Sequence, residues 1–307
     1  MPGKLLVNFP TNIGDTILGL PVMDKLRAVF PQARLIAISS PKTHELLKRN
    51  SFIDEVILFD KYWPWQRQLT FYLKLWGSYV FIADLKNSAL PLLLPCRQAT
   101  PSVRIPEKKI HVRFEYLKLI SNLVMTDIYP RSKFKLTSEE ISKWDSVKFS
   151  NPVFVACSSR SDLKQYPYEK LKLVVNELSS EKQIVIVGEE KDRLFYRDIL
   201  TSRNTIDLLG KTALHEVFYI MEKYAALLLC VDSSIMHLAG YLNIPAVALF
   251  GPTDPARYGP WTDSSIVLKD TSQRCKSCQK SQYTWQSERM NIDPAEIIQA
   301  VRAKLRK

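Results

Sequence analysis

The carboxylate of Asp15 is the first side chain in the sequence whose type and position suit chemistry. It ends the loop Asn12-Ile13-Gly14-Asp15, between an apolar run at 4–9 and a helical segment at 16–30. Gly14 permits a tight turn, which leaves Asp15 where the helix starts. A carboxylate there can cap the helix, or it can face a substrate from the carboxyl end of a strand and accept a proton. The sequence leaves both roles open.

A second polar loop follows the apolar run at 153–157 and contains Lys164. It begins with the hydroxyl groups of Ser158 and Ser159, and Pro167 helps to start the next helix. Hydroxyl groups, an ammonium group and a helix N-terminus together suit a phosphate. The alternative interpretation is an ordinary solvated loop.

A third polar stretch, Asp232-Ser233-Ser234, follows the apolar run at 227–230 and precedes another helix. Asp232 or Ser233 can cap this helix, whose free N–H groups attract a diphosphate by roughly 0.3–1 kcal/mol through the helix dipole. His237 lies one turn further along. Taken alone it is better explained by helix packing than by catalysis, although it also belongs to the candidate ligand-binding set.

Several familiar motifs are missing or incomplete. No G-x-G-x-x-G follows the first strand pattern, so the usual dinucleotide fingerprint is absent. Gly210-Lys211-Thr212 resembles the end of a P-loop but lacks the glycine that should precede it. Cys275 and Cys278 have the spacing of half a zinc site without a second pair. We therefore expect no bound metal and no cofactor.

Short apolar runs alternate with helical segments along most of the chain. This alternation predicts parallel sheets that are covered by helices on both faces. It is interrupted at 88–113, where prolines and basic residues predict a long loop. Helices are expected at 138–148 and, further on, at 189–201.

The same alternation predicts two domains. A linker near 149–152 divides the chain into lobes at 1–150 and 151–307, and the second lobe ends in an amphipathic helix at 294–305. We expect an α/β fold with two doubly wound parallel-sheet lobes. Ligands of such sheets bind outside the carboxyl ends of the strands, so a cleft between the lobes is the expected site.

The net charge of +12 lies mostly in the first half of the chain. Residues 1–150 carry 22 Lys and Arg against 13 Asp and Glu, whereas residues 151–307 carry 21 against 18. This balance is compatible with nucleic acid, an anionic membrane surface or an acidic glycan. The basic residues of the proline-rich segment are the predicted contacts of an acidic acceptor: Arg97, Arg104, Lys108, Lys109 and Arg113.

Taken together, these blocks resemble glycosyltransferase family 9, the bacterial lipopolysaccharide heptosyltransferases. The resemblance covers nearly the whole chain and implies a GT-B fold with two Rossmann-like lobes. Its markers are Gly14-Asp15 followed by Leu20-Pro21, Lys164-x-Tyr166-Pro167, the block from Val231 to Ala239, and Phe250-Gly251-Pro252-Thr253-x-Pro255.

The resemblance implies an inverting, metal-independent transfer of a heptose or related sugar. The donor would be an ADP-sugar bound by the C-terminal lobe. The acceptor would be an acidic lipopolysaccharide inner core bound by the N-terminal lobe. By position, Asp15 would act as the general base, and Lys164 would neutralise the departing diphosphate.

The resemblance also assigns donor contacts in the C-terminal lobe. Asp232 would bind sugar hydroxyl groups, while Ser233 and the N–H groups after it would hold the phosphates. Asp192, which follows Gly188 by four residues, would contact the nucleotide ribose, with Glu190 as the near alternative.

Two other functions are compatible with this fold. One is a glycosyltransferase that uses another nucleotide sugar and a surface glycan. The other is a non-catalytic protein that binds a sugar nucleotide and would not need Asp15. A nucleic-acid binder is disfavoured, because Asp15, Lys164 and Asp232 are all present.

The sequence predicts a cytoplasmic protein. No apolar stretch is long enough to cross a bilayer, and the N-terminus does not resemble a signal peptide. Peripheral attachment to the inner face of the cytoplasmic membrane is expected, because the implied acceptor lies there. An aromatic segment interleaved with Arg67 and Lys74 either touches that surface or, in the plainer interpretation, packs a helix against the sheet; its members are Tyr62, Trp63, Trp65, Phe71, Tyr72 and Trp76.

Overall fold

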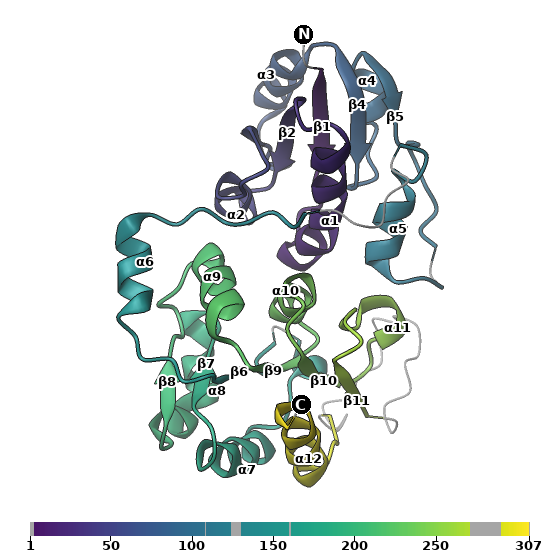
Figure 1. Cartoon of the computed structure of the whole chain (residues 1–307). Helices are drawn as coiled ribbons and strands as arrows, with labels where there is room; N and C mark the ends of the chain where they lie inside the picture. The colour runs from purple at the N-terminus through teal and green to yellow at the C-terminus, as the bar shows by residue number, and fades with distance from the viewer. Residues whose placement is uncertain (1–2, 108, 124–129, 160, 271–289, 307) are drawn as a thin grey trace. The chain divides into compact units, whose positions relative to one another are not determined.

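A computed structural model describes residues 3–107, 109–123, 130–159, 161–270 and 290–306, without the side chain of residue 162. The chain divides into two compact units, Met1–Leu136 (unit 1) and Thr137–Lys307 (unit 2). Each unit is built on its own parallel sheet (Figure 1). The prediction of an α/β fold with two doubly wound sheets is therefore confirmed.

Unit 1 contains a five-stranded parallel sheet in the order β3-β2-β1-β4-β5. Its central strands are short apolar runs that are buried on both faces, as expected for a sheet enclosed by helices. The strands are β1 (Lys4–Asn8), β2 (Arg34–Ser39), β3 (Glu55–Leu58), β4 (Tyr79–Asp84) and β5 (Cys96–Ala99). The helices are α1 (Ile13–Val29), α2 (His44–Lys48), α3 (Trp65–Leu75), α4 (Leu90–Leu93) and α5 (Val112–Lys118).

One face of this sheet is covered by α3 and α4. Side chains from both helices join those of β1, β2 and β4 in a single apolar cluster that includes Leu6, Ile36, Phe71, Leu75 and Leu90. The outer surfaces of α3 and α4 therefore lie on the same side of the sheet.

Unit 2 contains a six-stranded parallel sheet in the order β11-β10-β9-β6-β7-β8. The strands are β6 (Val153–Ala156), β7 (Ile184–Ile186), β8 (Thr205–Asp207), β9 (Leu227–Val231), β10 (Ala246–Phe250) and β11 (Ile266–Lys269). The helices are α6 (Ser138–Asp145), α7 (Tyr168–Ser179), α8 (Arg193–Tyr196), α9 (Leu214–Tyr224), α10 (Ser234–Leu242), α11 (Pro255–Tyr258) and α12 (Pro294–Leu305). The C-terminal helix agrees with the predicted range.

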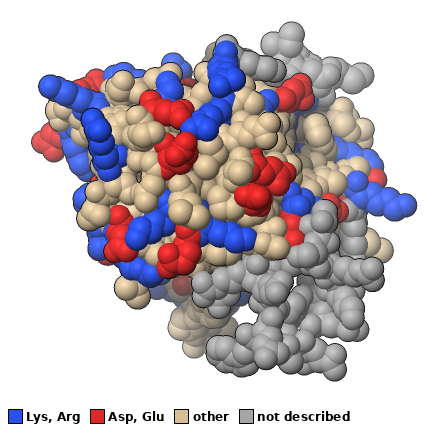
Figure 2. All heavy atoms as spheres, turned by 90° about the horizontal axis from the view of Figure 1, so that it is seen from below, with Lys and Arg blue, Asp and Glu red and all other residues tan. Residues whose placement is uncertain are grey.

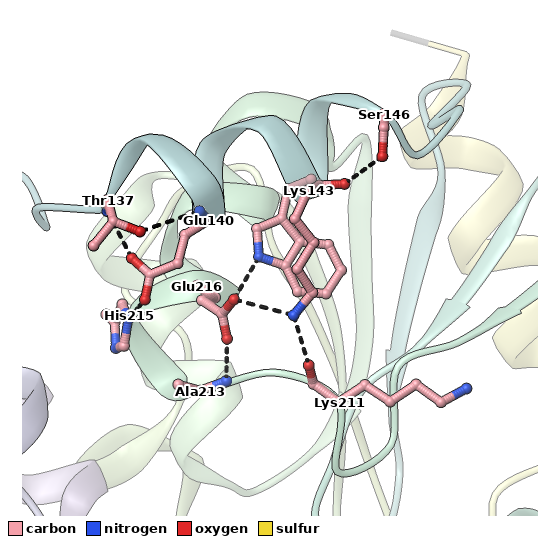
Figure 3. A network of polar contacts seen from close by, with 9 residues as sticks. Thr137, Glu140, Lys143, Ser146, Lys211, Ala213, His215 and Glu216 are labelled. Atoms are coloured by element: carbon pink, nitrogen blue, oxygen red, sulfur yellow. Dashed lines mark hydrogen bonds and ion pairs between the residues drawn. The ribbon is translucent and has the colours of Figure 1, made fainter.

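The boundary between the units lies at 136/137, earlier than the predicted 150/151. Helix α6, which the sequence placed in the first lobe, packs on α9 of unit 2 (Figure 3). The Trp144 side chain is 2% exposed, and its indole N–H donates to Glu216 Oε1 at 2.7 Å. Lys143 and His215 add polar contacts between the same two helices. A linker therefore precedes α6 rather than following it.

Two segments differ from the predicted secondary structure. The proline-rich segment 88–113 is not one long loop, because it contains α4 and the edge strand β5. Pro91 stands in the first turn of α4, where it is tolerated because no N–H is needed there. The single helix predicted at 189–201 is broken into α8 and two 3₁₀ turns, Glu190–Asp192 and Arg197–Thr201.

Both signs of charge are interspersed on the face seen from below in Figure 2. In unit 2, α12 and α7 are joined by ion pairs of this kind, for example Arg302 with Glu177 at 2.7 Å. This face therefore lacks the broad basic surface that binding to a nucleic-acid backbone requires.

Candidate functional site

The best-defined polar pair in unit 2 joins Lys164 to Asp232. Lys164 ends a 3₁₀ turn after β6, and Asp232 directly follows β9. Strands β6 and β9 are neighbours in the sheet, so their carboxyl ends lie side by side. The ammonium nitrogen of Lys164 lies 2.6 Å from Asp232 Oδ2, and the two side chains are 35% and 8% exposed. The sheet thus brings together two residues that the sequence singled out separately.

The N-terminus of α10 lies next to this pair in the chain. Ser233 is the N-cap residue, with an extended backbone (φ −151°), and Ser234 is the first helical residue. The Ser233 hydroxyl makes no capping hydrogen bond, and its oxygen is buried without a hydrogen-bond partner among the residues that the structure describes. A buried hydroxyl group without a partner is costly, so an absent ligand is a physical explanation for it.

His237 lies one turn into α10 and packs against an aromatic residue. Its ring is 5% exposed and is stacked on Trp261, with the ring centroids 6.2 Å apart and the planes at 11°. Gly240 makes room for this indole, because a Cβ atom there would lie 3.0 Å from Trp261 ring atoms. The structure therefore gives His237 a packing role. Sequence reasoning did not identify Trp261, for which the helical glycine was the available signal.

Ser158 and Ser159 lie at the start of the loop after β6, where a buried tyrosine binds the backbone. The Tyr196 hydroxyl accepts the N–H groups of Cys157 and Ser158 at 2.6 and 3.1 Å. Burial raises the pKa of Tyr196 well above its ordinary value, so the phenol stays protonated. The hydroxyl group of Ser159 accepts the N–H of Ser161 at 3.2 Å. Sequence reasoning missed Tyr196, which anchors the loop that carries Lys164.

Asp192 closes the turn after β7. Its Oδ2 atom accepts the N–H of Glu189 at 2.8 Å. A Cβ atom on Gly188 would lie 2.8 Å from the same oxygen, which explains why glycine occupies that position. The alternative residue, Glu190, binds the guanidinium of Arg193 at 2.6 Å. Both candidates at the carboxyl end of β7 thus bind groups of the protein itself.

Asp15 in unit 1 is the third residue of α1 rather than its cap. The N-cap residue is Asn12, and its side chain makes no capping hydrogen bond. The Asn12 amide instead donates to Asp15 Oδ2 at 3.2 Å. The capping role considered for Asp15 is therefore wrong, and the carboxylate stands in the first turn, at the carboxyl end of β1.

A buried carboxylate that the sequence did not single out lies near the carboxyl ends of β1 and β4. Asp84 is fully buried, and its Oδ1 atom accepts a hydrogen bond from the Asn8 side-chain amide at 2.7 Å.

Arg104, one of the basic residues predicted to bind an acceptor, lies at the same end of β4. Its Nη2 atom donates to the Asp84 carbonyl at 2.7 Å, and its Nη1 atom donates to the Pro101 carbonyl at 3.0 Å. Desolvation lowers the pKa of Arg104, whereas the nearby negative charge of Asp84 raises it. Arg104 thus links the end of β4 to the backbone that follows β5.

The other basic residues predicted to bind an acceptor differ in their surroundings. Arg97 on β5 and Lys109 are exposed. Arg113 is half-buried, and its guanidinium carbon lies 5.1 Å from the centre of the Phe114 ring. Lys108 lies outside the described residues, as do Cys275 and Cys278.

No group of three or more His, Cys, Asp or Glu side chains in the described part of the chain is arranged to hold a metal ion. No described helix combines the length and apolar character needed to cross a bilayer.

Residues 100–287 match the family described as "Glycosyltransferase family 9 (heptosyltransferase)". Lipooligosaccharide heptosyltransferase 2 of Campylobacter jejuni is 22% identical over 297 residues, which cover 90% of this chain and 89% of that protein. A family 9 glycosyltransferase structure from Veillonella parvula superposes with a TM-score of 0.79 at 21% identity, over 99% of this chain and 97% of the other. The structure of Escherichia coli ADP-heptose lps heptosyltransferase II gives a TM-score of 0.74 at 20% identity, with 98% of both chains covered.

Proposed function

Since the chain belongs to glycosyltransferase family 9, the heptosyltransferase family, we propose that it transfers a heptose or closely related sugar from an ADP-sugar to an acidic lipopolysaccharide inner-core acceptor. The chain is an enzyme of the glycosyltransferase class. The donor, the stereochemistry and the metal requirement are parts of the proposal. The similar Escherichia coli structure is that of an ADP-heptose lps heptosyltransferase, which supports the choice of donor.

One observation carries the proposed donor site: Lys164 and Asp232 meet beside the start of α10, where the Ser233 hydroxyl is buried without a partner in the described part of the chain. A diphosphate at this position gains a cation, a hydroxyl donor and helix N–H groups. Asp232 is then available for sugar hydroxyl groups. Asp192, at the end of β7, is proposed to contact the ribose.

The charges of these groups suit an inverting displacement. An acceptor hydroxyl oxygen forms the new bond to the anomeric carbon on the face opposite the donor oxygen, so the configuration inverts. Asp15 takes the hydroxyl proton. The bond between the anomeric carbon and the diphosphate oxygen breaks, and its electron pair leaves with ADP. Lys164 and the α10 N–H groups stabilise the charge that develops there. No step in this scheme needs a metal ion.

The surface of unit 1 supports the choice of acceptor and location. Its exposed basic side chains, among them Arg97 and Lys109, suit a glycan that carries phosphates and carboxylates. Such an acceptor is linked to a lipid. We therefore propose a cytoplasmic enzyme that acts at the inner face of the cytoplasmic membrane.

The proposal is tested by measuring nucleotide release from a panel of nucleotide sugars, with and without a lipid A core acceptor and a chelator. ADP release that depends on ADP-heptose and the acceptor, and that persists in the chelator, is the expected result. Equal or faster turnover of a different nucleotide sugar would replace the donor. Turnover that is lost in chelator and restored only by a divalent ion would contradict the metal-free mechanism.

A further inference from the structure

Helix α3 has apolar side chains on two sides, although only one side faces the sheet. Phe71 and Leu75 are 6% and 1% exposed and belong to the core of unit 1. Trp65, Leu69 and Leu73 lie on the other side and are 70%, 51% and 64% exposed. These three residues are spaced by four positions, so they form one stripe along the helix.

The stripe extends beyond α3. Trp76, at the end of the helix, continues it and is 66% exposed, and Tyr62, just before the helix, is 82% exposed. Helix α4, which covers the same face of the sheet, exposes Leu92 and Leu93. We call these seven side chains of α3, α4 and their ends the α3–α4 surface. A set of large apolar groups of this size on one face of a domain is typical of an interaction surface.

Internal packing accounts for the other aromatic residues of this segment but not for the stripe. The rings of Phe71 and Tyr72 pack around Phe59, with centroids 4.7 and 6.1 Å away, and Trp63 lies 6.1 Å from the same ring. The aromatic residues of the segment are thus divided. Half of them stabilise unit 1, whereas Tyr62, Trp65 and Trp76 are exposed.

The charge of this segment limits the kind of partner. Between 61 and 83 the chain carries Lys61, Arg67 and Lys74 and no Asp or Glu. All three cations are exposed, and the Arg67 guanidinium is held over the Trp63 ring at 4.0 Å. Exposed Trp and Tyr residues beside Lys and Arg match the boundary between lipid headgroups and acyl chains, where indole rings and cations are both accommodated.

We propose that the α3–α4 surface docks unit 1 on an anionic lipid bilayer, with the Trp65, Leu69, Leu73 and Trp76 stripe at the headgroup boundary. The inference rests on the proposed function, in which the acceptor is anchored in a membrane. Apolar burial provides the attachment, and the cations give it a preference for anionic lipid. Docking keeps the enzyme on the surface where its acceptor is found.

The experiment measures co-sedimentation of the full-length protein with phosphatidylcholine vesicles that contain or lack phosphatidylglycerol. We expect binding to the anionic vesicles that weakens as salt is added. Trp65→Ser combined with Trp76→Ser should reduce the partition coefficient at least about tenfold, because two large apolar groups no longer enter the lipid. Arg67→Gln combined with Lys74→Gln should reduce the preference for anionic vesicles.

Matched controls are available in unit 2. Leu173 and Leu194 are also exposed apolar side chains on helices, at 61% and 79%. Leu173→Ser combined with Leu194→Ser should leave vesicle binding unchanged. Equal binding by the Trp65/Trp76 variant and the wild-type protein would overturn the proposal. The proposal would also be overturned if the wild-type protein formed a dimer without lipid and the Trp65/Trp76 variant lost the dimer but still bound vesicles. That result would assign the α3–α4 surface to contact with a second copy of the chain.

A second assay separates this proposal from the proposed function. Transfer to a delipidated core oligosaccharide should be the same for the Trp65/Trp76 variant and the wild-type protein, since no membrane takes part. If the wild-type protein transfers sugar to that acceptor but does not bind vesicles, the docking proposal fails and the function stands. If it binds vesicles but transfers no heptose, the function fails and the docking surface stands.

Discussion

The ammonium nitrogen of Lys164 lies 2.6 Å from Asp232 Oδ2. Asp232 is almost buried, so the lysine compensates a carboxylate that water reaches poorly. A diphosphate that binds at α10 would compete for the same ammonium group. Each partner can be tested by its effect on donor affinity.

Lys164→Ala should weaken ADP-sugar binding roughly 10- to 100-fold and slow transfer, because hydrogen bonds to charged groups contribute about 1.5–3 kcal/mol. Isothermal titration with ADP measures the first effect and steady-state kinetics the second. Lys172→Ala is the matched control, since Lys172 pairs with Asp198 on the surface of the same unit. Unchanged donor affinity and turnover in Lys164→Ala would remove Lys164 from the donor site.

Ser233→Ala should weaken donor binding without lowering the melting temperature of the ligand-free protein. Loss of an N-cap hydroxyl usually costs about 1 kcal/mol. Here the Ser233 hydroxyl makes no capping bond and has no partner in the described chain, so its removal relieves a desolvation penalty. Differential scanning calorimetry with and without ADP separates the two effects. A fall in stability without ADP, at unchanged ADP affinity, would show that the hydroxyl serves the fold.

The positions of Lys164 and Asp232 could be predicted from the sequence only in part. Each follows an apolar run, and parallel strands bring such loops to one edge of the sheet, so a shared site was predictable. Their direct contact depends on β6 and β9 being neighbours, although they are separated by two strands in the chain. Tyr196 and Trp261 were missed for a related reason, because each is placed by tertiary packing with residues far away in the sequence.

Secondary structure was predictable where burial imposes a pattern. The central strands and α12 match their predicted ranges closely, because buried strands need apolar runs and amphipathic helices need apolar residues at helical spacing. Strand β5, with the sequence CRQA, lies at the edge of its sheet and has little apolar character, so its pattern resembles a loop. The boundary of the units was misplaced because the contact of Trp144 with Glu216 joins segments that are far apart in the chain.

Glu216→Ala should lower the stability of unit 2 by about 1–3 kcal/mol, because it leaves the buried indole N–H of Trp144 without its acceptor. The Glu216 carboxylate also accepts the Ala213 N–H at 2.6 Å, which the substitution removes as well. Urea unfolding, followed by tryptophan fluorescence, measures the change. Trp144→Phe, which retains a large ring but no N–H, should cost less. Wild-type stability in Glu216→Ala would mean that the hydrogen bond between Trp144 and Glu216 does not stabilise unit 2.

The basic residues of unit 1 should divide into two classes when they are neutralised. Arg97→Ala combined with Lys109→Ala should raise the acceptor Michaelis constant severalfold, with added salt having the same effect, and should change stability by less than about 0.5 kcal/mol. Arg104→Ala should instead destabilise the protein by about 1–3 kcal/mol, since its guanidinium binds two backbone carbonyls. If the double variant changed only donor kinetics, the acceptor would not bind these side chains.

Asp15→Asn should lower the transfer rate by roughly a hundred- to ten-thousandfold, the usual contribution of a general base, because an amide cannot take the acceptor proton. Stability and ADP affinity should stay near wild type. Asp15 is not the N-cap residue of α1, and a first-turn carboxylate contributes only about 0.3–1 kcal/mol through the helix dipole. Rapid-quench kinetics and thermal melts measure the two quantities.

Asn12→Ala is the control, because it removes the 3.2 Å contact with Asp15 and keeps the carboxylate. If Asp15 acts as the base, Asn12→Ala should retain most of the activity that Asp15→Asn loses. If both substitutions instead lower the transfer rate only slightly, Asp15 is not the general base. Its role is then limited to supporting the first turn of α1, and another group removes the proton from the acceptor hydroxyl.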